Sequence, residues 1–159
     1  MKIKKIKKIK TKKIKKIKTK KTKKQKKTKN LVLPLKYSRC IWYFSFIHLF
    51  AGIYGIINNH YFLASLSLGA VLTSINYWGN PLSNCWGRYL DIVYIQISLY
   101  CHIYYGLKSK MKLGYLYFLS ISITCYFLSY YFKKKYYSTL FHIMVHVFGC
   151  MANTLLYSG

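Results

Sequence analysis

The sequence predicts an all-α protein, a polytopic transmembrane bundle of about five helices preceded by a disordered lysine-rich N-terminal tail. The first observation is that 18 of the 27 Lys and Arg residues fall within the first 30 positions, so the net charge of +26 belongs mainly to one end of the chain. The second is that the remaining roughly 125 residues are too apolar and aromatic for a soluble globule of that size. A basic nucleic-acid-binding domain is excluded because the charge lies in a tail and not on a folded face.

The tail and its linker cover residues 1–38, and the transmembrane helical domain covers residues 39–157. The Lys-Ile-Lys-Lys repeats predict disorder, because closely spaced like charges repel each other. As an alternative, the isoleucines of the tail form an apolar stripe that could fold as a helix on an anionic membrane. The expected partners are therefore membrane lipids, with anionic headgroups bound by the tail, and no specific nucleic acid.

Apolar runs long enough to cross a hydrocarbon layer of ~30 Å define the helices, because each crossing needs about 20 residues. The predicted helices are residues 39–57, 61–78, 89–106, 113–132 and 138–157. The polar breaks between them are residues 58–60, 79–88, 108–112 and 133–135. The excess of positive charge in the tail predicts a cytoplasmic N-terminus, although the lysines of residues 108–112 would then lie on the opposite side.

Asp91 is the only acidic residue of the chain. It lies just inside the third predicted helix, where an unpaired charge costs up to ~3 kcal/mol at the bilayer centre and less near the interface. This position predicts a functional carboxylate. The alternative is an interfacial residue paired with Arg88.

The last predicted helix carries His142 and His146, four residues apart and therefore on one face. Gly149 and Asn153 continue this face, which we expect to lie inside the bundle. Two imidazoles at this spacing can bind zinc together. The alternative is a pair of histidines that only form hydrogen bonds between helices.

Depth along the helices brings further polar residues to a similar level. At 1.5 Å per residue from one membrane face, Asp91 lies ~3 Å deep, and Ser74 and His142 each ~6 Å deep. His146 follows at ~12 Å. Three helices therefore contribute polar groups to one region.

A catalytic zinc usually takes three protein ligands and a water, so a third ligand is needed. His48 lies ~13 Å from the same face and is the best candidate. His102 falls in the opposite half of the bilayer, and His60 lies in a loop on the far side.

Three short motifs resemble a superfamily of membrane hydrolases and receptors that includes the alkaline ceramidases and the progestin and adipoQ receptors. They are Thr73-Ser74-Ile75-Asn76-Tyr77-Trp78, Arg88-Tyr89-Leu90-Asp91 and Phe141-His142-Ile143-Met144-Val145-His146. The family pattern is a Ser on an early helix, an Asp near the start of the next, and His-x-x-x-His on the last.

The resemblance implies zinc-dependent hydrolysis of a lipid amide. It implies that Asp91 handles the proton of the water, that Ser74 assists, and that His142 and His146 hold the metal. The family's third metal-binding histidine lies four residues after the Ser, where this chain has Trp78, and the family has seven helices. A complete zinc site here would therefore need His48.

The sequence thus leaves two main functions open. The first is a zinc-dependent lipid-amide hydrolase with Asp91 as general base. The second is a non-enzymatic membrane scaffold or bilayer-remodelling protein whose tail binds anionic lipid. A transporter or channel has less support, because a single acidic residue is available to line a pathway.

Overall fold

The computed structural model describes residues 31–159, so the predicted tail over residues 1–30 lies outside the described part. The helices are α2 (Leu35–Ser45), α3 (Ile47–Ile57), α4 (Tyr61–Trp78), α5 (Trp86–Gly106), α6 (Lys112–Tyr131) and α7 (Lys135–Tyr157). The predicted all-helical class is confirmed. Three stretches are long and apolar enough to cross a membrane, namely Leu35–Ile57, Lys112–Tyr131 and Lys135–Tyr157.

The first predicted helix is α2 and α3 together, and its predicted start at residue 39 is wrong. The helix already begins at Leu35, directly after Pro34, whose fixed φ suits the entry to a helix. The predicted boundary between linker and membrane domain therefore falls inside α2. Between α2 and α3 the helix tightens locally at Phe46, whose amide donates to the Tyr43 carbonyl at 3.3 Å and whose carbonyl accepts from the Leu49 amide at 3.0 Å.

The turn between α3 and α4 lies where the sequence predicted it, and α4 has the predicted bounds. Asn59 adopts a left-handed conformation with a φ of 64°. The His60 amide donates to the Gly55 carbonyl at 2.8 Å, and the Asn59 amide donates to the Ile56 carbonyl at 3.1 Å. This pair of bonds is a Schellman motif, which uses the last free carbonyls of α3 and ends the helix.

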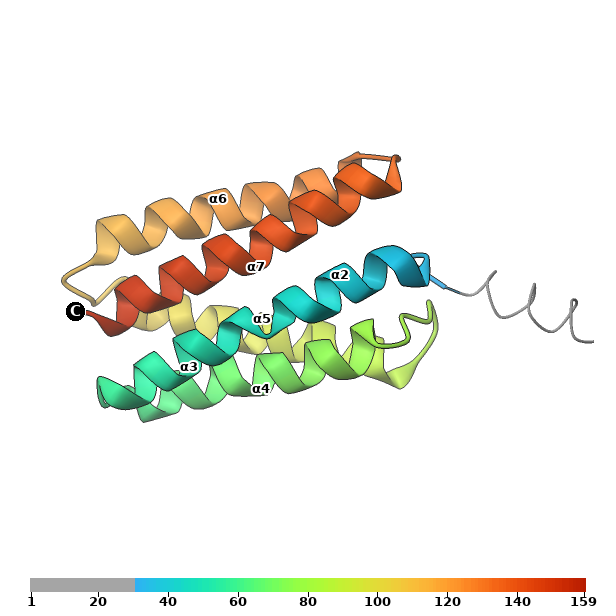
Figure 1. Ribbon diagram of the computed structural model, residues 1–159. Coiled ribbons are helices and arrows are strands. Elements are labelled where there is room, and N and C mark those ends of the chain that lie inside the picture. The colour runs from blue at the N-terminus through green and yellow to red at the C-terminus, as the bar shows by residue number, and fades with distance from the viewer. Residues whose placement is uncertain (1–30) are drawn as a thin grey trace, which may run out of the picture.

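Consecutive helical rods run in opposite directions, and α7 lies between α6 and the α2–α3 rod (Figure 1). On its other side the α2–α3 rod packs on α4, and α4 packs on α5. Because α2 and α7 begin at the same end, they run parallel. The chain thus builds one bundle in which α3, α4, α5 and α7 meet.

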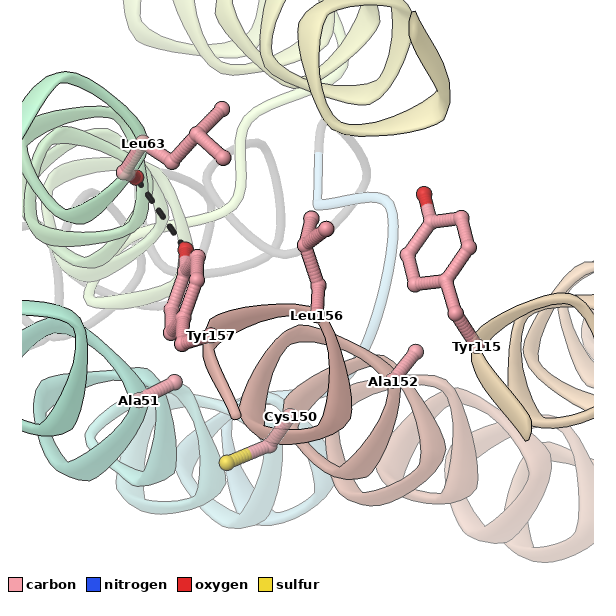
Figure 2. Packing of buried hydrophobic residues seen from close by; sticks show 7 residues of the cluster. All are labelled: Ala51, Leu63, Tyr115, Cys150, Ala152, Leu156 and Tyr157. Atoms are coloured by element: carbon pink, nitrogen blue, oxygen red, sulfur yellow. Dashed lines mark hydrogen bonds between the residues drawn. The ribbon is translucent and has the colours of Figure 1, made fainter. Parts of the chain in front are cut away.

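A cluster of buried side chains surrounds the C-terminal half of α7 (Figure 2). It consists of Ala51, Leu63, Tyr115, Cys150, Ala152, Leu156 and Tyr157. Elsewhere the interior is largely polar, with buried Ser38, Ser45, Ser67, Ser98, Ser122, Ser129 and Thr139. The exterior carries large apolar side chains, among them Phe50, Leu72, Ile97, Leu113 and Phe127. This distribution is the reverse of that in a soluble protein, which buries its large apolar residues first.

The fold predicts that Gly106→Ala destabilises the bundle. A methyl group at Gly106 would overlap with the ring of Tyr115, a rigid side chain that is fully buried. Overpacking of this kind costs about 1–3 kcal/mol. We expect a lower thermal unfolding midpoint of the detergent-purified protein.

Gly149→Ala is the matched control, because its nearest neighbours, His48 and Ser122, lie 3.6 Å from the added methyl group. This change should leave the midpoint unchanged or raise it, since Ala favours a helix over Gly by up to about 1 kcal/mol. Equal midpoints for the Gly106 variant and the native protein would contradict the packing described here.

Candidate functional site

Ser74 of α4 and Asp91 of α5 form the first part of the candidate site. The Ser74 hydroxyl donates to Asp91 Oδ1 at 2.9 Å, and the two side chains are only 4% and 8% exposed. Arg88 does not take this role, because its guanidinium donates to the Ser83 carbonyl at 2.9 Å. The carboxylate thus has Oδ1 fixed by a hydroxyl group of α4.

His48, His142 and His146 form the second part, and they come from α3 and α7. Nε2 of His48 and Nδ1 of His146 lie 3.2 Å apart. The ring centroid of His146 lies 5.3 Å from that of His48 and 5.3 Å from that of His142. The structure therefore brings the three predicted metal ligands into one contact cluster, although the sequence separates His48 from His146 by 98 positions.

The buried Nε2 atom of His146 has no hydrogen-bond partner within residues 31–159. Unpaired buried polar atoms are rare in folded proteins, because each costs about 1–3 kcal/mol. His146 is 7% exposed, so bulk water reaches this atom poorly. This nitrogen lies on the other side of the ring from Nδ1, which faces His48, so hydrogen bonds among the described residues do not close the histidine cluster.

Trp78 links the two parts of the site. It lies one turn after Ser74 on α4, and its ring meets the ring of His142 edge to face at 4.9 Å between centroids. The position at which the resembled family carries its third metal-binding histidine thus lies directly against His142. In this chain an indole occupies it, and an indole offers no lone pair to a metal.

The predicted polar face of α7 lies inside the bundle, as its neighbours show. Gly149 faces His48, because a methyl group added at Gly149 would lie 3.6 Å from Cε1 of the imidazole. One turn further on, Asn153 donates from Nδ2 to the Ser67 hydroxyl at 3.3 Å. The stripe that begins at His142 therefore faces α3 and α4 along most of its length.

The separation of the His48 and His146 nitrogens fits shared zinc ligation. Two nitrogens bound to one tetrahedral zinc lie about 3.3 Å apart, because each Zn–N bond measures ~2.0–2.1 Å. The same distance also fits a hydrogen bond. Across the described residues, however, no three His, Cys, Asp or Glu side chains are arranged to hold an ion as they stand. The ring of His142 only packs against the ring of His146, so the side chain of His142 must change conformation before all three histidines can bind one zinc ion.

A second polar cluster, which the sequence did not predict, lies further along α4, α5 and α7. His102 Nδ1 lies 2.7 Å from the Ser98 carbonyl, and His102 Nε2 lies 2.8 Å from the Tyr157 hydroxyl. The Tyr157 hydroxyl is also 2.8 Å from that of Ser67, which accepts from Asn153. Because a carbonyl only accepts, Nδ1 of His102 donates and Nε2 accepts from Tyr157.

This Ser67–His102–Tyr157 network is closed, since both nitrogens of His102 have partners. The i, i+4 spacing of Ser98 and His102 was visible in the sequence and could have indicated a polar face on α5. Tyr157 gave no such signal, because it is one of 18 tyrosines. His60, which the sequence placed outside the site, stacks on Tyr157 at 5.7 Å between ring centroids.

No protein-family model, curated protein or solved structure matches this chain. The resemblance to the alkaline ceramidase superfamily therefore stays a prediction from its three motifs.

The closed network predicts that Tyr157→Phe destabilises the protein. Loss of the hydroxyl leaves His102 Nε2 and the Ser67 hydroxyl without their common partner in a buried place, which costs about 1–2 kcal/mol. We expect a lower thermal midpoint in detergent. Tyr54→Phe is the control, because its hydroxyl bonds to Ser158 at an exposed position and its loss should cost little.

Proposed function

We propose that this protein is a multi-pass integral membrane protein whose α4 and α5 cross the bilayer together with the three apolar stretches. Support comes from the reversed distribution of polar and apolar side chains. The exposed side of α5 carries Ile92, Val93, Ile95 and Ile97, which water would not favour. At 1.5 Å per residue, the 18 residues of α4 and the 21 residues of α5 extend ~27 and ~32 Å, close to the hydrocarbon thickness.

The charges at the two ends of the bundle support a cytoplasmic N-terminus. The end where α2 begins carries six basic residues, Lys36, Arg39, Arg88, Lys133, Lys134 and Lys135. The opposite end carries three, Lys108, Lys110 and Lys112. Because basic residues collect on the cytoplasmic side, the folded part and the tail favour the same orientation.

For this site we propose zinc-dependent hydrolysis, with a lipid amide as the substrate class that the three motifs imply. One observation carries this proposal: Nε2 of His48 and Nδ1 of His146 lie 3.2 Å apart, which fits two ligands of one zinc, and the ring of His142 contacts that of His146. His48, His142 and His146 would hold the ion. A zinc ion bound there supplies a Lewis acid that polarises the amide carbonyl and acidifies water.

Asp91 and Ser74 have separate roles in this reaction. Ser74 fixes Oδ1 of the carboxylate by its hydrogen bond, so the other oxygen accepts the proton of the attacking water. The water oxygen adds to the carbonyl carbon, the C–N bond breaks, and Asp91 passes the proton to the departing amine. A lipid substrate suits the site because the proposed catalytic and metal-binding residues lie on the membrane-spanning helices. The acyl chains of a lipid are already in the surrounding bilayer.

The non-enzymatic alternative has an observation of its own. The Ser67–His102–Tyr157 network has the completeness expected of polar residues that only hold helices together. In a scaffold the Ser74–Asp91 pair and the histidines would act in the same way. The metal content of the protein separates the two functions.

The hydrolase proposal predicts about one zinc per chain in the detergent-purified protein, because a catalytic zinc keeps three protein ligands. His142→Ala and His48→Ala should each lose most of this zinc, whereas His60→Ala should keep it. Trp78→His places an imidazole against His142 and should raise zinc affinity. Inductively coupled plasma mass spectrometry measures the zinc content of the native protein and the four variants. A zinc-free native protein from a zinc-supplemented preparation would contradict the hydrolase proposal and favour the scaffold.

Asp91→Asn is predicted to lower hydrolysis of a fluorescent lipid amide by about 10²–10⁴-fold, because the amide cannot accept the proton. Its zinc content should stay at the native level. Ser74→Ala should reduce the rate less, since it removes an orienting bond and not the base. Native activity in the Asp91 variant would remove the proposed base.

A further inference from the structure

A groove at the N-terminal ends of α2 and α7 has no role in the proposed hydrolysis. Its volume is about 260 Å³. Leu140 and Ile143 of α7 and Cys40 of α2 line its length, while Lys36 and Tyr136 lie near its end. Small-molecule pockets usually measure ~300–1,000 Å³, so the groove fits part of one acyl chain and not a whole lipid.

The charge around this groove is positive and has no counterion within the protein. Lys36 is exposed on the second residue of α2, and Lys135 is the first residue of α7. The only acidic residue of the whole chain is Asp91, whose carboxylate bonds to Ser74. The first turns of α2 and α7 hold no acidic residue, and both helix N-termini point to this end. No acidic side chain of the protein neutralises these lysines, so they are free to bind an anionic group.

We propose that this groove binds one anionic phospholipid, with an acyl chain along Leu140 and Ile143 and the phosphate beside Lys36. The inference rests on the membrane location proposed above and is independent of the hydrolysis. Burial of an acyl chain from a bilayer gains little, because the surrounding lipid is equally apolar. The selectivity therefore comes from the charge, and one lysine near the phosphate gives about a fivefold preference for an anionic lipid.

A second groove provides an internal comparison. It lies between α3, α6 and α7, measures about 270 Å³, and is lined by Ile47, Phe118, Met151 and other uncharged residues. The two grooves thus have nearly the same volume and differ in charge. Leu140 in the first groove and Met151 in the second are both on α7 and both 41% exposed, so a tryptophan at either position fills one groove from its accessible side.

The test uses the full chain in detergent, incubated with equal amounts of phosphatidylglycerol and phosphatidylcholine that carry the same acyl chains. Native mass spectrometry measures the ratio of the two lipids retained. Lys36→Gln should lower the preference for phosphatidylglycerol about fivefold. Leu140→Trp should lower it similarly by blocking the groove, whereas Met151→Trp should keep the native ratio. The basic tail is present in every variant and contributes equally to each.

The native ratio in both Lys36→Gln and Leu140→Trp would overturn the proposal, because the tail alone would then select the lipid. An equal loss in Met151→Trp would overturn it as well. The replaced side chains are at least partly exposed, and a native thermal midpoint shows that each variant folds. A chain that stays folded in solution without detergent would refute the membrane location, whereas an absent preference in a detergent-requiring chain refutes the groove alone.

Discussion

The structure depends on one constraint, which is that its polar side chains must find partners inside the bundle. The surface is covered by large apolar and aromatic residues, so serines, histidines and the single carboxylate have no polar exterior to face along most helices. Many hydroxyls satisfy this need locally by bonding to the carbonyl four residues earlier, as Thr139 does at 2.7 Å. Other polar side chains join helices, as Ser74 and Asp91 do, and such interhelical contacts define both polar clusters.

The two clusters use the same chemistry and differ in how complete they are. In the Ser67–His102–Tyr157 network each ring nitrogen of His102 has a partner, and the network holds α4, α5 and α7 together. In the histidine cluster, Nε2 of His146 has none among the described residues. A closed network stabilises one arrangement, whereas the histidine cluster leaves one buried nitrogen unpaired and brings Nδ1 of His146 against Nε2 of His48 at a separation that fits zinc ligation. This difference is why we assign the chemistry to one cluster and a structural role to the other.

Trp78 places an apolar ring against one of the three histidines of the site. Its ring packs with Ile41 and Tyr77 in an apolar cluster and at the same time meets His142. An imidazole at this position would add a ligand, whereas the indole adds apolar packing and excludes water from one side of His142. The proposed zinc site therefore takes its third ligand from α3, where His48 already contacts His146.

The sequence by itself determined the helices and the faces they turn inward. Apolar runs with polar breaks gave the helix of residues 61–78 its bounds, and the i, i+4 spacing of His142 and His146 placed both on one face, because helix geometry is local. The start at Leu35 was missed because Lys36 and Arg39 interrupt the apolar pattern there, and the tighter turn at Phe46 was missed because the apolar run continues through it. Only the tertiary structure decided which polar groups meet, such as His48 with His146 and His102 with Tyr157. These contacts depend on how whole helices pack, which a pattern along one helix does not encode.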